Sequence, residues 1–283
     1  MTPFLGIYRE PICSPGRHLE NDRTILELAA RHLETRGHRV ALSSADDAER
    51  AGRDASVVFS MSRSPRCLEL LTRWEREGKT IVNRPRAVID TARDRLARRS
   101  FGAASLPATR VVATARALRG QIGDPFGAGA QWVKGGELFS SRREDVRRVE
   151  TRDALDLVLD DFECRGIATA VLQEHVEGRE IKFYAVGPEG FFHWLGADEA
   201  AGRLPRRDFQ VPATAAGTSV ALEVFGGDIV IRGDGRIVLI DLNDWPSFAP
   251  CPDAGARAIA GHLEARLADS YAVASPARPA PSA

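Results

Sequence analysis

The stretch from Val224 to Phe248, VFGGDIVIRGDGRIVLIDLNDWPSF, constrains the fold most, because it has the pattern of a β-hairpin. Asp234-Gly235 separates two apolar runs, and both residues tolerate the positive φ that a tight turn requires. If these two residues are the whole loop, Gly233 faces Arg236 across the hairpin. The stretch therefore predicts two antiparallel strands in a defined register.

Three oxygen-bearing side chains fall on one face of this hairpin. Counting outward from the turn puts Asp228 directly opposite Asp241, and Asn243 projects from the same face as Asp241. Opposed residues have Cβ atoms only ~4.5–5.5 Å apart, so two carboxylates there repel each other and require a cation. A few hard oxygen ligands suit Mg²⁺, which also keeps waters and binds phosphates. The alternative is a surface hairpin with solvated carboxylates.

Composition narrows the classes of protein that this chain can belong to. Its 283 residues suit one large or two modest domains, and 39 basic residues balance 39 acidic ones. This balance gives no global attraction to nucleic acid or anionic lipid. We find no signal-peptide pattern, no apolar run of membrane-spanning length, and no CxxC pair among the four cysteines. We therefore expect a cytoplasmic protein with neither a nucleic-acid nor a membrane partner.

The first 84 residues alternate short apolar runs with helical patterns. The runs with the length of strands are 4–8, 38–42, 55–61 and 80–83. The first helix can be capped by Asn21 or Asp22. Alternating strands and helices predict an open parallel sheet covered on both faces. Ligands of such sheets bind beyond the carboxyl ends of the strands, which points to Arg9, residues 60–64 and Asn83.

The remainder of the chain carries two candidate anion-binding features. Lys134 ends an apolar strand and precedes two glycines, so it can meet phosphate oxygens, or it can be a solvated lysine. Arg203, Arg206 and Arg207 lie in a loop that either binds an anionic substrate or is solvated. Helical patterns cover 87–100, which is rich in arginine, and 253–268 at the end of the fold.

Four segments between Arg84 and Leu267 resemble the ATP-grasp superfamily, in the expected order. They are VNRPRAVIDTARDRL, QWVKGG, VLQEHVEGREIKFYAVG and the hairpin ending IDLNDWPSF. They are similar to RimK-like glutamate ligases and, in the lysine after Glu180 and the Asp-x-Asn-x-x-Pro ending, to inositol trisphosphate kinases. The resemblance implies an α/β (α+β) chain. An N-terminal open parallel-sheet domain (1–84) would precede an ATP-grasp fold of two α+β subdomains (85–270), and 271–283 would be a disordered tail.

The resemblance also implies which residues bind ATP. Lys134 would contact the phosphates, and Arg95 would stand where the family has another phosphate-binding lysine. The adenine slot would be lined by Gln173, Glu174 and the backbone of Val176. The ribose hydroxyls would be bound by Glu180.

The same resemblance assigns the metal and the reacting groups. Asp228, Asp241 and Asn243 would hold one or two Mg²⁺ ions, with Mn²⁺ as the alternative metal. The charge of the transferred phosphate would be shared by Lys182 together with Arg203 or Arg206. Ser247 would supply a hydroxyl and a backbone N–H at the acceptor site. Trp245 and Phe248 would be its apolar walls, or else an aromatic plug of the core.

The implied activity is that of an ATP-dependent ligase, which joins a small-molecule or peptide carboxylate to an amine through an acylphosphate. A small-molecule kinase is the second interpretation, in which a hydroxyl accepts the phosphate. The third is a non-catalytic nucleotide-binding protein, against which the complete metal set argues. The chain shows no Ser/His/Asp or Cys/His nucleophile pattern, and phosphoryl transfer requires none.

Overall fold

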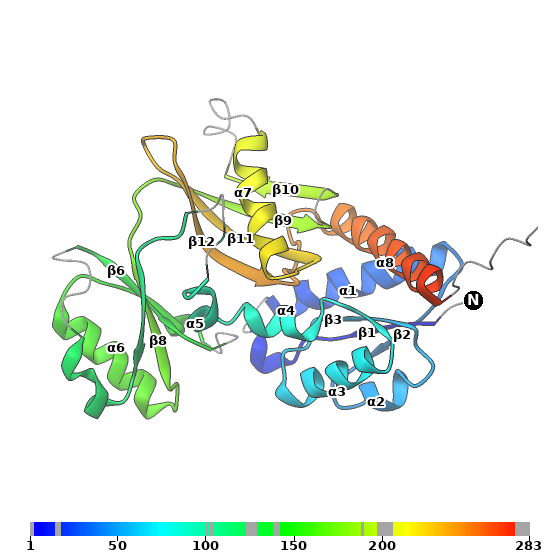
Figure 1. The fold of residues 1–283 in the computed structure, drawn as a ribbon, viewed down its shortest axis with the longest axis horizontal. Helices are drawn as coiled ribbons and strands as arrows, with labels where there is room; N and C mark the ends of the chain where they lie inside the picture. The colour runs from blue at the N-terminus through cyan, green and yellow to red at the C-terminus, as the bar shows by residue number, and fades with distance from the viewer. Residues whose placement is uncertain are drawn as a thin grey trace, which may run out of the picture.

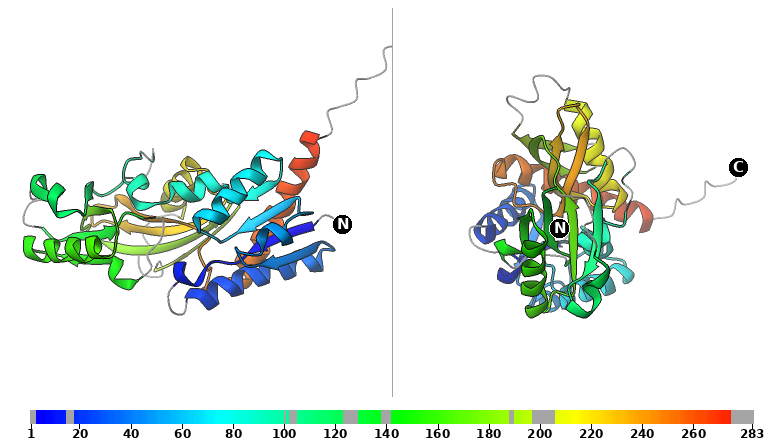
Figure 2. Two further views of the ribbon diagram at one scale, coloured as in Figure 1. Left: turned by 90° about the horizontal axis from the view of Figure 1, so that it is seen from below. Right: turned by 90° about the vertical axis from the view of Figure 1, so that its left-hand side faces the viewer.

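Three four-stranded sheets, one parallel and two antiparallel, organise the part of the chain that the computed structural model describes. That part comprises residues 3–14, 18–99, 101, 105–122, 129–137, 142–187, 190–196 and 206–274. The parallel sheet and the sheet that contains β6 and β8 lie at opposite ends of the long axis (Figure 1, Figure 2). The third sheet lies between them, so it can contribute side chains toward both. The mixed fold class is confirmed.

The parallel sheet is built by the N-terminal unit, with strand order β2-β1-β3-β4. Its strands are β1 (Pro3–Ile7), β2 (Arg39–Ser43), β3 (Val57–Ser60) and β4 (Thr80–Val82). Its helices are α1 (His18–Thr35), α2 (Ala48–Ala51) and α3 (Pro65–Arg76), with a 3-10 turn η1 (Pro11–Cys13) after β1. Successive residues of its strands point to opposite faces of the sheet, and apolar side chains on each face belong to a separate buried cluster. Helices therefore cover both faces, as the sequence predicts.

The C-terminal helix α8 (Pro252–Ala274) covers one face of this N-terminal sheet together with α1 (Figure 1). Ile259 and Leu263 of α8 share a core cluster with Ile25 of α1 and Phe59 of β3. The helix runs six residues beyond the predicted end at 268, and 275–283 lie outside the described residues. The end of the chain is thus part of the N-terminal core.

The sequence suggested Asp22 as a possible cap of α1, but the structure shows that it is not the cap. The helix already begins at His18, so Asp22 lies in its second turn and is buried. Its carboxylate pairs with Arg9 Nε at 2.9 Å and accepts a hydrogen bond from Ser14 Oγ at 2.7 Å. A buried carboxylate requires such partners, and they take precedence over capping.

The sheet with strand order β5-β8-β6-β7 forms the middle unit. Its strands are β5 (Thr109–Ala113), β6 (Gln131–Gly135), β7 (Val146–Val149) and β8 (Thr169–Glu174). The helix α6 (Arg152–Cys164) packs its apolar stripe on this sheet, and the 3-10 turns are η2 (Arg116–Gln121) and η3 (Arg143–Asp145). Thr151 caps α6 by accepting a hydrogen bond from the backbone N–H of Ala154.

The third sheet has strand order β10-β9-β11-β12. Its strands are β9 (Arg179–Val186), β10 (Phe191–Leu195), β11 (Val224–Ile231) and β12 (Ile237–Asp244). The helix α7 (Arg206–Ser219) packs on one face, and α4 (Pro85–Asp90) and α5 (Arg93–Leu96) connect this region to the N-terminal unit. Where the sequence suggested one helix over 87–100, the chain forms two short helices. Within the described residues, no helix is both long and apolar enough to cross a membrane.

The β11–β12 hairpin has the predicted pairing of Asp228 with Asp241, although its turn differs from the prediction. Arg232 donates its N–H to the carbonyl of Arg236, so the loop has three residues instead of two, and Gly233 does not face Arg236. Near the other end, Ile240 is an extra residue in β12, because Ile229 pairs with Leu239 whereas Asp228 pairs with Asp241. This β-bulge shifts the register by one residue and restores the predicted pairing.

Candidate functional site

Lys182, Asp228 and Asp241 lie side by side on three adjacent strands of the third sheet. Asp228 on β11 is the Cα partner of Lys182 on β9 and of Asp241 on β12. Lys182 Nζ lies 2.7 Å from Asp228 Oδ1, and the Lys182 side chain remains 49% exposed. Directly paired residues share a face, so one ammonium and two carboxylates occupy a small area.

Asn243 adds a carboxamide to the same face. It pairs with Gly226, which carries no side chain, and lies two residues beyond Asp241. The described part of the chain contains no group of three His, Cys, Asp or Glu residues arranged for a metal. The third protein ligand beside the two carboxylates would therefore be this carboxamide. An all-oxygen set of three donors fits Mg²⁺ or Mn²⁺ with water and phosphate oxygens completing the coordination.

Burial and neighbouring charges act differently on the two carboxyl groups. Burial raises the pKa of Asp228, and Lys182 offsets this only in part. Burial acts in the same direction on Asp241, but Arg93 and Lys134 outweigh it and hold the pKa of that carboxyl below its ordinary value. Asp241 is thus the more firmly ionised of the two. Its charge belongs to a cluster that extends onto the middle sheet.

Lys134 is buried between the two antiparallel sheets, with only 6% of its surface exposed. Its Nζ donates to Gln173 Oε1 on β8 at 2.8 Å and to the carbonyl oxygen of Ile240 on β12 at 3.4 Å. Burial lowers the pKa of this lysine, and Asp241 acts in the opposite direction. Lys134 is therefore not a solvated lysine. The bulge at Ile240 supplies one of the two hydrogen-bond acceptors that Lys134 has among the described residues.

Arg93 lies at the site, whereas Arg95 does not. Arg93 Nη2 is 3.7 Å from Asp241 Oδ2, and its side chain is 18% exposed. Arg95 instead pairs with Asp90 at 3.3 Å and is 45% exposed. The cause is the break between α4 and α5, where Ala92 has an extended backbone with ψ of 134°. The expected substitution of Arg95 for a phosphate-binding lysine is therefore not supported by its position, and sequence reasoning missed Arg93.

A cavity between the two antiparallel sheets combines these cations with apolar walls. Its polar lining comes from Arg93, Lys134, Gln173 and Asp241. Its apolar lining includes Leu96, Phe101, Leu106, Val171, Leu239 and Ile240. A flat aromatic ring joined to an anionic chain matches such a lining, because apolar walls and cationic side chains occur together in it.

The other residues expected to bind the nucleotide lie along the β8–β9 connection. Glu174 and Glu180 are exposed, and Glu180 pairs with Val230 of β11. The Val176 side chain is buried in a small cluster with Val230 and Val238. Of the residues expected at the adenine and the ribose, Gln173 alone among those described lines the cavity between the sheets.

A larger cleft of about 930 Å³ separates the N-terminal unit from the third sheet. The N-terminal unit contributes Arg9, Asp22 and Arg63, and the third sheet contributes Lys182, Tyr184, Asp241 and Asn243. Arg142 and Ser247 also line the cleft. Arg203 lies outside the described residues, and Arg206 is the first residue of α7, in a helix where a loop was expected. The charged face of the third sheet thus opens onto a space that can hold a second molecule.

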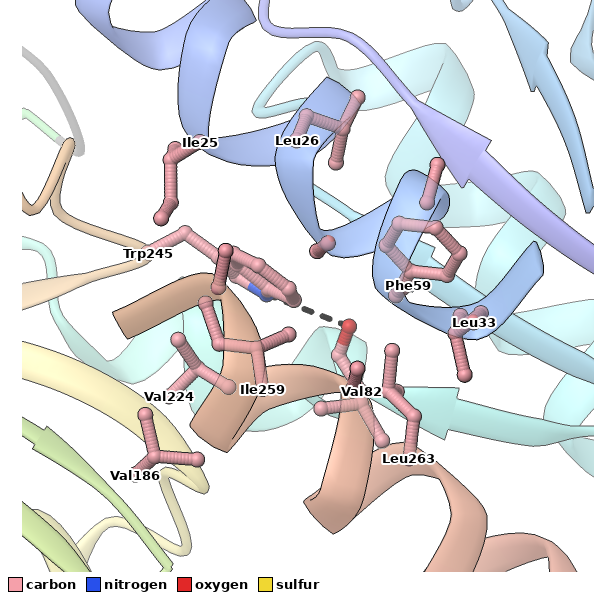
Figure 3. Close-up of a cluster of buried hydrophobic side chains, with 14 of the residues drawn as sticks. Ile25, Leu26, Leu33, Phe59, Val82, Val186, Val224, Trp245, Ile259 and Leu263 are labelled. Atoms are coloured by element: carbon pink, nitrogen blue, oxygen red, sulfur yellow. Dashed lines mark hydrogen bonds between the residues drawn. The ribbon is translucent and has the colours of Figure 1, made fainter. Parts of the chain in front are cut away.

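The side chains of Trp245 and Phe248 lie in the core, although Trp245 also borders this cleft. Both are fully buried in the core cluster that joins the third sheet to the N-terminal unit. Trp245 Nε1 donates to the carbonyl oxygen of Val82 at 3.2 Å (Figure 3). The alternative, an aromatic plug of the core, describes both side chains, and Phe248 is not a wall of the cleft. Pro246 and Ser247, which lie between them, do line the cleft.

Comparisons with known proteins relate the chain to solved structures. No protein-family profile matches the sequence, and no curated protein matches it. A D-alanine–D-alanine ligase from Bacillus anthracis complexed with ATP superposes with a TM-score of 0.69 at 12% identity, over 96% of this chain and 98% of the other. The ATP-grasp ligase PsnB superposes with a TM-score of 0.61 at 15% identity, over 94% and 99%. The D-cycloserine synthetase DcsG superposes with a TM-score of 0.65 at 18% identity, over 93% of this chain and 99% of the other.

Proposed function

Because the chain has the ATP-grasp fold along nearly its whole length, we propose that it is an ATP-dependent ligase that joins a carboxylate to an amine. The observation that carries this proposal is the cluster of Lys134, Asp228 and Asp241 with Lys182 and Arg93, which lies where the two antiparallel sheets meet. Opposite charges at this density match a metal–triphosphate group. The similar solved structures include three ligases or synthetases, one of them complexed with ATP.

In this proposal ATP occupies the cavity between the sheets. Lys134 and Arg93 contact its phosphates, since both line the cavity and both approach Asp241. Gln173 lines the same cavity beside Lys134. The proposed roles of Glu174 and Val176 at the adenine and of Glu180 at the ribose rest on the sequence resemblance. They require the nucleotide to extend along the β8–β9 connection.

Asp228, Asp241 and Asn243 are the proposed ligands of Mg²⁺, with Mn²⁺ as the alternative. When bound, the metal neutralises charge that shifts between the phosphates during transfer. Lys182 already pairs with Asp228 and is half exposed, so it can follow the transferred phosphate into the cleft. Ser247 and Arg206, together with Arg203 outside the described residues, remain proposed contacts of the substrate or of the transferred phosphate.

The proposed reaction has two steps. The substrate carboxylate attacks the γ-phosphorus, the bond to the β–γ bridging oxygen breaks, and ADP and an acylphosphate result. The amine then attacks the acyl carbon, phosphate leaves, and the nitrogen loses a proton. Positioning and electrostatic stabilisation carry most of such a reaction. The cleft beside Lys182 is large enough for a small-molecule or peptide carboxylate and its amine partner.

A screen for substrate-dependent ADP release tests the proposal. Pairs of carboxylates and amines, including amino acids and short peptides, are offered with Mg²⁺ and ATP, and ³¹P NMR identifies the phosphorus products. A ligase releases ADP and free phosphate only when both partners are present. ADP with a phosphorylated single substrate would indicate a kinase instead. If calorimetry detects no ATP binding, the proposed nucleotide site is disproved as well.

A further inference from the structure

Two buried arginines of the N-terminal unit contact the backbone directly after Asn243. Arg9, which follows β1, donates from Nη2 to the carbonyl oxygen of Trp245 at 2.6 Å. Arg63, which follows β3, donates from Nη2 to the carbonyl oxygen of Asp244 at 3.2 Å and pairs with the Asp244 carboxylate. Strand ends that are more than 180 residues away in sequence therefore contact the end of β12.

Each arginine is itself held in place. Arg9 Nε pairs with the buried Asp22, as described above. The loop that carries Arg63 is held by Glu10, which accepts the backbone N–H of Arg63 at 3.0 Å. The Asp244 side chain is completely buried and that of Arg63 is 11% exposed. Buried charges are tolerated only with partners in good geometry, so this network admits few alternative arrangements.

The segment that the arginines contact has an unfavourable backbone conformation. Trp245 has a φ of +38° and Phe248 a φ of +49°, although neither is glycine. Such conformations cost on the order of 1–3 kcal/mol each and persist only where surrounding contacts impose them. The contacts here are the Arg9 bond to the Trp245 carbonyl and the Trp245 indole bond to Val82 (Figure 3). The chain after Asn243 is thus held by the N-terminal unit.

From this geometry we infer that Arg63, through Asp244, is a positioning residue for the metal site. Asp244 is the next residue after Asn243, so fixing the Asp244 carbonyl and carboxylate holds the end of the backbone from which the Asn243 carboxamide projects. The inference rests on the proposed function, because it takes Asn243 as a metal ligand. It assigns the N-terminal unit a part in metal binding, in addition to forming one side of the cleft.

The test is the double variant Arg63→Met with Asp244→Asn, which removes both charges and so leaves no buried charge unpaired. Mn²⁺ binding in the presence of a non-hydrolysable ATP analogue is measured by electron paramagnetic resonance. We expect Mn²⁺ affinity to fall about 10- to 100-fold, the usual effect of removing a group that orients a metal ligand. Affinity for the analogue without metal, measured by calorimetry, should not change.

The matched control is Arg165→Met with Asp145→Asn. This ion pair is similarly buried, at 16% and 4% exposure, but lies in the middle unit. The control should lose stability without losing Mn²⁺ affinity. Unchanged Mn²⁺ affinity in the Arg63 and Asp244 double variant would overturn the inference. A double variant whose only change is a raised KM for the carboxylate substrate would also overturn it.

A second variant covers the case in which the double variant fails to fold. Arg63→Lys keeps the charge, but it replaces the guanidinium, whose Nη2 donates to both Asp244 oxygens, by an ammonium of different reach and geometry, so Mn²⁺ affinity should fall by a smaller factor. Wild-type affinity in this variant would overturn the inference. If the wild-type protein itself binds no Mn²⁺ with the analogue, the proposed function fails, and this outcome is separate from the variant results.

Discussion

The two ends of the β11–β12 hairpin are stabilised in different ways. At the tip, the contacts are local: Arg232 bonds to Arg236, and the Asp234 carboxylate accepts from Arg236 Nε at 2.7 Å. At the base, the contacts come from distant parts of the chain, namely Arg9, Arg63 and Val82. The tip can form from its own sequence. The base requires the N-terminal unit to be folded, and it carries the candidate metal ligands.

This difference predicts a gradient of mutational effects along the hairpin. Changes at the base should affect core stability or chemistry, because many groups there depend on one another. A change beside the middle part should affect a single proposed contact with the nucleotide. Changes at the tip should alter only the local backbone energy. The following variants test the gradient from the base toward the tip.

The largest effect on stability is expected from Trp245→Ala. Removing a fully buried indole costs about 3–5 kcal/mol of unfolding free energy, and the Val82 carbonyl also loses its donor. Urea denaturation measures this loss. The control is Leu157→Ala on α6, which is 69% exposed and should change stability by less than about 0.5 kcal/mol. A loss below about 1 kcal/mol for Trp245→Ala would show that the base does not depend on this side chain.

The next effect concerns chemistry at the base. Asp241→Asn preserves the shape of the side chain but removes its charge, so ADP release should fall by about 100-fold or more. The melting temperature should fall modestly, because Arg93 and the buried Lys134 lose a counter-charge, and the relieved repulsion between Asp241 and Asp228 offsets this loss only in part. The matched control is Asp234→Asn at the tip, which should leave turnover unchanged. Wild-type turnover in Asp241→Asn would show that this carboxylate is not a ligand of the proposed metal site.

The same hairpin shows how far the sequence predicts the structure. The alternation of apolar and polar residues predicts both strands, and Asp-Gly predicts the turn, because these are local properties. The pairing of Asp228 with Asp241 was predicted from a two-residue loop. The actual three-residue loop shifts the register by one residue, and the bulge at Ile240 shifts it back. The Ile240 carbonyl in this bulge accepts a hydrogen bond from Lys134 on another sheet, a contact that no local pattern reveals.

The errors elsewhere share this cause. The resemblance placed Arg95 where the family has a phosphate-binding lysine, whereas the chain brings Arg93 to the site. The two arginines lie after a break at Ala92, which has neither glycine nor proline to announce it. Trp245 and Phe248 come shortly after β12, which carries the candidate metal ligands, so a place in the cleft was a reasonable expectation. Which way they point is decided by a core built from the N-terminal unit and α8, far away in sequence. Long-range packing of this kind leaves no local signal.

On β9, beside the β11 strand of the hairpin, Glu180→Ala tests the proposed nucleotide contact. Glu180 pairs with Val230, between base and tip, and is exposed. If it binds the ribose hydroxyls, ATP affinity measured by calorimetry should weaken by about 1–3 kcal/mol, the scale for hydrogen bonds to a charged acceptor. Glu177→Ala, on the same connection and 88% exposed in its side chain, is the control. Equal ATP affinity in the two variants would mean that Glu180 is not a ribose contact.

The smallest effect is expected at the tip, from Gly235→Ala. Gly235 has a φ of +83°, and a Cβ added there would meet nothing within 4 Å, so the cost is confined to the backbone. For an alanine in this left-handed region the cost is about 1 kcal/mol of unfolding free energy. Gly233→Ala is a matched control, since its Cβ would also meet nothing within 4 Å and its φ is not positive. Gly233→Ala should leave stability unchanged or slightly raise it.

Both variants should release ADP at the wild-type rate, because the tip shares no contact with Lys182, Asp228 or Asp241 among the described residues. A loss of turnover in Gly235→Ala that exceeds its loss of stability would show that the tip transmits its conformation to the base, and the two ends would then no longer be independent.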